Sequence, residues 1–444
     1  MQALTEMLSQ EIRDNGGAIP FERFMELAVY APGLGYYETA ARTPGRRGDF
    51  YTSVSVGCLF GELLAYQFSR WLDSLGERGK PATSCQIVEA GSHDGRLAED
   101  ILNWLHVFRP DLAQRLTYVI LEPSAVRQSW QRERLARFAA HEPPHPILLP
   151  QGGEGARRAV EGDSAIRNPQ SAISQVRLLN STATKVGESC GQAAQGATVQ
   201  WHSTWQTVSA VNGIIFSNEL LDAFPLRRLG WDRANQRWFE WGVTWAKDRF
   251  GWVRLPCSAD GSAEEPMHFF NLGQPWSRLG ALPEELLGTL PDGYTIEISP
   301  RAVAWWQKAA HMFEQGWLLA FDYGYLAGEL FRPERTQGTL RAYAHHAQSA
   351  DVLANPGEQD LTAHVNFSAL QHAGREAGTN DGNLVSQSQF FMQTLAAITR
   401  NPAGFAPWNA ARTRQFQTLT HPDFLGQSFK VLCQEKSEAT IEEC

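Results

Sequence analysis

The sequence predicts an α/β fold built on a Rossmann-like sheet, with a helical and loop cap at the N-terminus and a β-rich insertion. Three observations predict this class. Residues 84–102 resemble a buried strand followed by a turn with two glycines and a helix. Buried strands that end in an acidic residue recur at residues 117–121, 213–225 and 317–325, as in a doubly wound sheet. Alternating tryptophan-rich stretches between residues 226 and 293 are typical of antiparallel β structure.

The N-terminal segment, residues 1–80, is expected to form the cap. Apolar residues recur at helical spacing over residues 4–12 and again over residues 21–28. A segment punctuated by glycine and proline follows, and its length is typical of lids and binding loops. A wide apolar face over residues 59–75 then predicts another helix.

The glycine turn lies in residues 81–225, which we expect to form the first part of the Rossmann-like domain. Glu89 ends the first strand, Gly91 and Gly95 lie in the turn, and a helix begins near Arg96. The N-terminus of a helix leaves backbone amides free, and glycine lets a ligand approach the backbone. This segment therefore has the local geometry of a nucleotide-sized site.

The rest of the chain is expected to complete the sheet around two insertions. Residues 141–200 are rich in Gly, Ala, Ser, Gln and Pro, and we interpret them as a flexible insertion that carries no chemistry. The tryptophan-rich block at residues 226–293 is the β-rich insertion. Residues 294–444 would supply the remainder of the Rossmann-like domain and the last strands.

Composition excludes several classes of protein. The chain has 444 residues, of which 43% are hydrophobic and 20% charged, as in an ordinary soluble protein. Its formal net charge of -9 argues against a nucleic-acid binder that works through bulk electrostatics. No apolar run is long enough to span a bilayer and no targeting pattern opens the chain, so we expect a cytoplasmic protein without a membrane partner. The six cysteines show no CxxC spacing, so neither a disulfide framework nor a metal site is indicated.

Four predicted strands end in acidic corners, at Glu89, Glu122, Asn218-Glu219 and Asp322. Because the carboxyl ends of parallel strands meet at one edge of a sheet, we expect these corners to converge on a nucleoside-like ligand. A carboxylate at the end of the second strand is placed to accept hydrogen bonds from ribose hydroxyls. Each feature also has a structural interpretation: a glycine turn can be only a tight connection, Glu122 can cap the next helix, and tryptophans more often pack than bind substrate.

Several longer segments occur in a fixed order along the chain. They are FMELAVYAPGLGYY, GRRGDFYTS followed by LFGELLA, VEAGSHDGRLAEDIL, ILEPS, SNELLDAFP, AFDYG, GTLRAY and DLTAHVNFSAL. With these segments the chain resembles, over nearly its full length, the MidA family of class I S-adenosylmethionine-dependent methyltransferases. That family includes the mitochondrial complex I assembly factor, a protein arginine methyltransferase.

The resemblance implies S-adenosylmethionine as cofactor and gives individual residues roles. The residues it assigns to the cofactor are Asp49, Phe50, Thr52, Glu89, Gly91, His93, Asp94, Gly95, Glu122 and Asn218. Among them, Glu122 would hold the ribose and the first three would cover the cofactor. Glu219 and Asp222 would face the methyl group and the acceptor. Catalysis would then depend on alignment, desolvation and a carboxylate that orients or deprotonates the acceptor.

The chain departs from the family pattern at several positions. His93 stands where the family usually has glycine, and its bulk would either crowd or contact the cofactor. Val54-Ser55 replaces a Pro-Glu pair, and His364 and Asn366 replace two aspartates. If the missing carboxylates bind a cationic acceptor, their absence weakens the arginine assignment more than the methyltransferase assignment.

Three functions therefore stay open from the sequence. The first is a methyltransferase that acts on a protein side chain, with arginine as a candidate acceptor. The second is a methyltransferase for a small molecule, which the tryptophan-rich insertion would suit as an apolar pocket. The third is a non-catalytic relative that binds the cofactor and a partner protein.

Overall fold

The computed structural model describes residues 2–39, 52–77, 84–138, 197–257, 288–344 and 347–437. Two of the residues expected to cover the cofactor, Asp49 and Phe50, lie outside these ranges. The expected insertion at residues 141–200 also lies outside them, apart from its last four residues, three of which belong to a strand.

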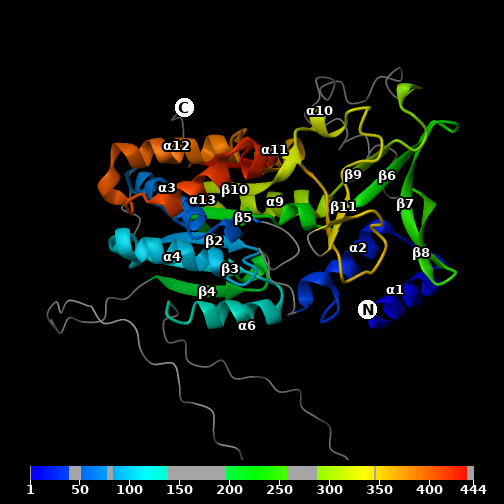
Figure 1. Ribbon diagram of the computed structural model, residues 1–444, viewed down its shortest axis with the longest axis horizontal. Coiled ribbons are helices and arrows are strands. Elements are labelled where there is room, and N and C mark those ends of the chain that lie inside the picture. The colour runs from blue at the N-terminus through cyan, green and yellow to red at the C-terminus, as the bar shows by residue number, and fades with distance from the viewer. Residues whose placement is uncertain are drawn as a thin grey trace, which may run out of the picture. The chain divides into compact units, whose positions relative to one another are not determined.

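A mixed β-sheet forms the centre of the described chain. Its strands are β2 (Cys85–Ala90), β3 (Leu116–Leu121), β4 (Thr198–His202), β5 (Val211–Asn218), β10 (Phe313–Tyr325), β14 (Val365–Asn366), β15 (Asn383–Ser386) and β16 (Phe429–Lys436). The strand order is β15-β16-β10-β5-β2-β3-β4, and β14 pairs with β10. The strands from β10 to β4 are parallel neighbours, whereas β16 runs antiparallel to both β10 and β15. The predicted α/β class with a Rossmann-like sheet is confirmed (Figure 1).

The order of connections reverses beside β2. From β2 the chain proceeds to β3 and β4 on one side, and it then returns to β5 on the other side of β2. The crevice outside the carboxyl ends of strands at such a reversal is where ligands bind in open α/β sheets. Glu89 in β2 and Glu219 directly after β5 lie at this point.

Helices cover both faces of the sheet. One face packs against α3 (Leu59–Glu77), α4 (Arg96–Phe108), α12 (Gln387–Arg400) and α13 (Ala410–Thr420), and the other against α9 (Pro300–His311) and α11 (Phe367–Glu376). Successive strand residues alternate between the two cores: Ile87 and Ile214 face the first, and Val88 and Ile215 face the second. Burial of both faces explains why these strands appear in the sequence as continuous apolar runs. The described chain also contains α5 (Pro110–Ala113), α6 (Ala125–Arg134) and α10 (Ala327–Leu330).

A second, antiparallel sheet joins the tryptophan-rich block to the N-terminal residues. It consists of β1 (Ala18–Pro20), β6 (Arg227–Asp232), β7 (Arg237–Ala246), β8 (Arg249–Pro256) and β9 (Thr295–Ile298). Figure 1 shows these strands beside the N-terminal helices α1 (Gln2–Asp14) and α2 (Phe21–Tyr30). The ring of Phe21 lies 5.1 Å from that of Trp252, and the ring of Phe24 lies 5.2 Å from that of Phe250. The aromatic residues of the insertion therefore pack against the N-terminal helices.

A small third sheet contains β11 (Arg341–Ala344), β12 (Ala347–Ser349) and β13 (Asp360–Thr362).

None of the helices in the described residues combines the length and the apolar character that crossing a bilayer requires.

Candidate functional site

A cavity of about 340 Å³ lies at the carboxyl ends of β2, β3 and β5. Its walls come from the turn between β2 and α4, the turn between β3 and α6, and the residues that follow β4 and β5. Residues of the N-terminal cap close it from another side. The volume falls in the usual range for small-molecule sites.

The cavity brings together most of the residues that the resemblance assigned to the cofactor. Those that line it are Thr52, Glu89, Gly91, His93, Asp94, Glu122 and Asn218. Glu219, which was assigned to the methyl group and the acceptor, lines it as well. Gly95 does not line the cavity. It is the N-cap residue directly before α4 and has a φ of 81°. Asp222 lines a separate, smaller cavity.

The glycine turn forms with a histidine in the middle. Gly91 has a φ of 72°, and a Cβ atom at this position would lie 2.8 Å from Cδ1 of Leu220. His93 has a φ of 47°, in the left-handed region that few residues other than glycine adopt. Such conformations persist where the surroundings hold them in place, and they occur frequently at ligand sites. The substitution of His93 for glycine therefore keeps the turn and places an imidazole on the cavity wall.

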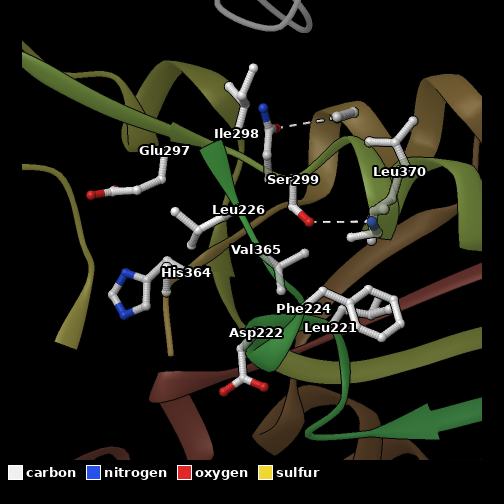
Figure 2. A pocket seen from close by; sticks show the side chains of 15 residues that line it. Leu221, Asp222, Phe224, Leu226, Glu297, Ile298, Ser299, His364, Val365 and Leu370 are labelled. Carbon is white, nitrogen blue, oxygen red and sulfur yellow. Dashed lines mark hydrogen bonds between the residues drawn. The ribbon is translucent and has the colours of Figure 1, made fainter. Parts of the chain in front are cut away.

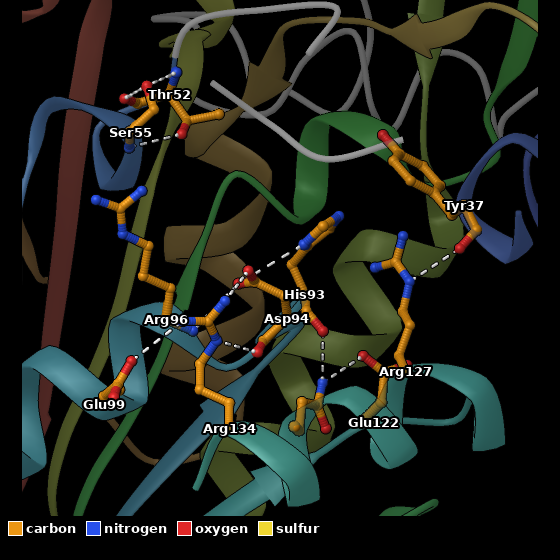
Figure 3. Close-up of polar contacts among 11 residues, drawn as sticks. Tyr37, Thr52, Ser55, His93, Asp94, Arg96, Glu99, Glu122, Arg127 and Arg134 are labelled. Carbon is orange, nitrogen blue, oxygen red and sulfur yellow. Dashed lines mark hydrogen bonds and ion pairs between the residues drawn. The ribbon is translucent and has the colours of Figure 1, made fainter. Parts of the chain in front are cut away.

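Helix α6 holds this turn from the outside (Figure 3). Nε2 of the fully buried Gln131 donates to the His93 carbonyl at 2.9 Å and to Oε2 of Glu122 at 3.3 Å. Arg134 donates to the Asp94 carbonyl at 2.9 Å and to its Oδ2 at 2.7 Å. Burial opposes ionisation of Asp94, but its hydrogen bond and ion pair with His93, together with the charge of Arg134, outweigh burial and lower its pKa to about 2.

Glu89 and Glu122 present buried carboxyl groups to the cavity. Burial raises the pKa of Glu89 to about 7, against the hydrogen bond that it accepts from the Tyr118 hydroxyl. Burial also raises the pKa of Glu122, which accepts a hydrogen bond from the Ser124 amide at 3.0 Å. Both groups are placed to accept hydrogen bonds from a bound ligand or to stabilise a positive charge on it.

Acidic side chains also cluster behind the end of β5. Glu219, at a φ of 51°, accepts hydrogen bonds from the Ser53 amide at 3.2 Å and from Nδ2 of Asn218 at 3.1 Å. Burial raises its pKa to about 8. Asp322 accepts a hydrogen bond from the Leu221 amide at 2.9 Å, and burial raises its pKa to about 7.

Asp222 belongs to the same cluster. Burial, followed by the charges of Asp322, Asp360 and Glu219, raises the pKa of Asp222 well above its ordinary value. The largest causes of the pKa shifts of Glu219 and Asp222 are burial and the charges of neighbouring acids, opposed at Glu219 by hydrogen bonds from Asn218 and Ser53. Burial and the neighbouring acids therefore favour the protonated forms of these carboxyl groups, and an approaching cation would favour their ionised forms.

The smaller cavity, of about 30 Å³, contains Asp222 and the two positions at which aspartate was expected (Figure 2). His364 lines it, and burial, followed by the charges of Arg341 and Arg335, lowers its pKa to about 4. Asn366 caps α11, since its side chain accepts a hydrogen bond from the Ala369 amide at 3.2 Å. Asparagine and aspartate cap helices equally well. Asn366 is therefore explained by local structure, and its lack of charge says little about the acceptor.

Several residues at the site were not predicted from the sequence. Gln131 is one, although its position four residues before the buried Leu135 places it on the inward face of the helix. Tyr118 and Asp360 are others. The hydroxyl of Tyr37 donates to Asp360 across 323 positions of sequence, a contact that no local pattern could indicate.

Comparisons with known proteins agree with this geometry. A family model described as "Putative S-adenosyl-L-methionine-dependent methyltransferase" matches residues 63–383. A crystal structure of a Burkholderia thailandensis protein bound to S-adenosyl-homocysteine is 26% identical, with a TM-score of 0.71, and the match covers 98% of this chain and 92% of that one.

Two curated relatives extend the comparison. The mitochondrial protein arginine methyltransferase NDUFAF7 homolog of Drosophila melanogaster is 25% identical over 422 residues, or 94% of this chain and 81% of the relative. The mitochondrial protein arginine methyltransferase NDUFAF7 of Xenopus tropicalis is 26% identical, over 93% of this chain and 81% of the relative. Both are named as mitochondrial proteins, and the expectation of a cytoplasmic protein was therefore wrong. The family model matches most of this chain, and the fold agrees with that of the Burkholderia thailandensis protein. This chain therefore belongs to the family of S-adenosylmethionine-dependent methyltransferases that the model describes.

Proposed function

We propose that this methyltransferase transfers the methyl group of S-adenosylmethionine to an arginine side chain of a protein. The observation that carries the choice of acceptor is the cluster of Glu219, Asp222, Asp322 and Asp360, in which the charges of Asp322 and Asp360 help to raise the pKa values of both Glu219 and Asp222. A guanidinium is permanently charged and planar, and its donors match paired carboxylates.

The large cavity fits the cofactor. At Gly91 a side chain would meet Leu220, so the absence of a Cβ keeps the turn open to a ligand. Glu89 would accept hydrogen bonds from the ammonium of the methionine part, and Glu122 from the ribose. Trp205 and Trp305 also line the cavity, with ring centroids 5.7 Å apart, and offer apolar surface for the purine.

When bound, S-adenosylmethionine supplies an electrophilic methyl group on a sulfonium. The chain's own contribution is to exclude water, to align the acceptor nitrogen and to take up its proton. Glu219 lines the cofactor cavity and also belongs to the acid cluster, and this supports a role for it between the two substrates. In the transfer, the sulfur–carbon bond breaks as the nitrogen–carbon bond forms, and the acceptor nitrogen loses one proton. We assign Glu219 to orienting the guanidinium and Asp222 to receiving this proton.

The relatives support a protein acceptor, since those compared above are named as protein arginine methyltransferases. The small-molecule alternative relied on an apolar pocket made by the tryptophan-rich block. Its tryptophans at positions 231, 238, 241, 245 and 252 are absent from the described walls of the cavity. Trp252 instead packs against the N-terminal helices.

The test is a transfer assay with the purified protein, methyl-labelled cofactor and a protein extract, followed by hydrolysis and identification of the labelled amino acid. We expect methylarginine. Asp222→Ala is expected to leave the affinity for S-adenosylhomocysteine within about threefold, because Asp222 does not line the large cavity, and to remove transfer. Label recovered only in small molecules, or only in other amino acids, would refute the proposed acceptor.

A further inference from the structure

The cofactor cavity is rich in acids, and this poses a problem for one part of S-adenosylmethionine. Glu38, Glu89, Asp94, Glu122 and Glu219 all line the cavity. They suit the sulfonium and the ammonium of the ligand, but in their ionised forms, as at Asp94, they repel the carboxylate at its amino-acid end. A cation on the wall would offset this repulsion and hold that carboxylate. The inference that follows rests on the proposed function, because it concerns the same ligand.

Three of the described lining residues can carry a positive charge: His93, Arg96 and Arg127. Arg127 is already engaged with the cap, since its Nε donates to the Tyr37 carbonyl at 2.9 Å and its guanidinium lies 5.0 Å from the centre of the Tyr37 ring. Nδ1 of His93 lies 3.9 Å from Oδ1 of Asp94, so the charge that this imidazole can carry is offset by an acid of this chain.

Arg96 is placed differently. It is the first residue of α4, and its backbone amide donates to Oδ1 of Asp94 at 3.2 Å, so the end of the helix is already satisfied by a carboxylate of the protein. Within the described residues its guanidinium makes no hydrogen bond or ion pair, and no dashed line reaches it in Figure 3. It acts through space on Asp100, as one of the charges that oppose the effect of burial there. The side chain on the cavity wall, rather than the helix end, is thus available to an anion.

We propose that Arg96 binds the carboxylate at the amino-acid end of S-adenosylmethionine and S-adenosylhomocysteine. The five donors of a guanidinium form a planar fork that matches a carboxylate. Arg96 thereby distinguishes the complete cofactor from nucleosides that lack the amino-acid end. The acids of the cavity hold the cationic groups of the ligand, and Arg96 holds its anion.

Calorimetric titration with two ligands tests this assignment. S-adenosylhomocysteine contains the amino-acid end, whereas 5′-deoxy-5′-methylthioadenosine shares the nucleoside thioether and lacks the carboxylate. Arg96→Gln is expected to weaken binding of S-adenosylhomocysteine about 10- to 100-fold, as for loss of a charged hydrogen bond. It should change binding of methylthioadenosine less than about twofold, and Arg96→Lys should recover part of the loss.

Arg137→Gln is the matched control, because it removes the same charge from the neighbouring surface, where Arg137 pairs with Glu99 at 2.8 Å outside the cavity. It should leave both affinities unchanged. Equal losses for the two ligands in Arg96→Gln, or an unchanged affinity for S-adenosylhomocysteine, would overturn the assignment. Failure of the wild-type protein to bind S-adenosylhomocysteine at all would overturn the proposed function as well, so the two failures are distinguishable.

Discussion

Replacing Gln131 with leucine tests whether helix α6 holds the cofactor site in shape. The buried Gln131 amide donates to the His93 carbonyl and to the Glu122 carboxylate, at 2.9 Å and 3.3 Å. Leucine has a similar volume but cannot donate, so both acceptors would lose this partner. A neutral hydrogen bond contributes about 1 kcal/mol and one to a charged group about 1.5–3 kcal/mol, which gives a local loss of about 2.5–4 kcal/mol.

Part of that loss should appear in cofactor binding, because both acceptors belong to residues that line the cavity. We expect the dissociation constant for S-adenosylhomocysteine to rise about 10- to 100-fold in calorimetric titration. Gln114→Leu is the control, because it is the same substitution at an exposed residue that does not line the cavity. Its effect should stay below about threefold. Wild-type affinity in Gln131→Leu would refute the role given to helix α6.

Two further perturbations address the turn and the acid cluster. Gly91→Arg should abolish binding of S-adenosylhomocysteine in the same titration, because a Cβ alone already lies 2.8 Å from Leu220; a wild-type isotherm would contradict this. Burial raises the pKa of Glu219 to about 8 and that of Asp322 to about 7, from ordinary values of 4.5 and 3.8. The folded protein therefore retains protons that the unfolded chain has released, so its stability should fall as pH rises from about 5 to 8. Glu219→Gln should make the midpoint of thermal unfolding less dependent on pH. A pH dependence parallel to that of the wild type would refute the raised pKa of Glu219.

Local pattern was sufficient to predict the strands that carry the site. The strand at Glu89, its glycine turn and the next strand at Glu122 are short, contiguous and strongly apolar, so sequence alone places them in neighbouring positions. The left-handed conformation at His93 was also consistent with what histidine tolerates.

The edge of the sheet was harder to predict. Strand β4, at Thr198–His202, overlaps the end of a segment that was interpreted as flexible, residues 141–200. It pairs with a strand on one side only among the described residues, and only one of its five residues is buried. An edge strand buries too little apolar surface to leave a clear pattern in one sequence.

Contacts between segments that are distant in the sequence could not be predicted for a different reason. Residues 18–20 pair with β7, more than 200 positions away, and this joins the cap to the tryptophan-rich block. Three residues form too short a strand to show an alternation. The role of Asn366 likewise became clear only from the structure, in which its side chain accepts a hydrogen bond from the Ala369 amide. The sequence shows that a carboxylate is missing at this position, but it does not show this hydrogen bond.

The protonation state of the acid cluster links the two halves of the proposed reaction. Without a cation, burial raises the pKa of Glu219 to about 8 and that of Asp222 well above its ordinary value, so their protonated forms, which cannot take a proton from an acceptor nitrogen, are favoured. A bound guanidinium would favour their ionised forms, because an opposite charge lowers the pKa of a carboxyl group. A carboxylate that can receive a proton thus exists mainly when a cationic acceptor is present. Since Glu219 also lines the cofactor cavity, this dependence would favour transfer to a cation over transfer to water or to a neutral nucleophile.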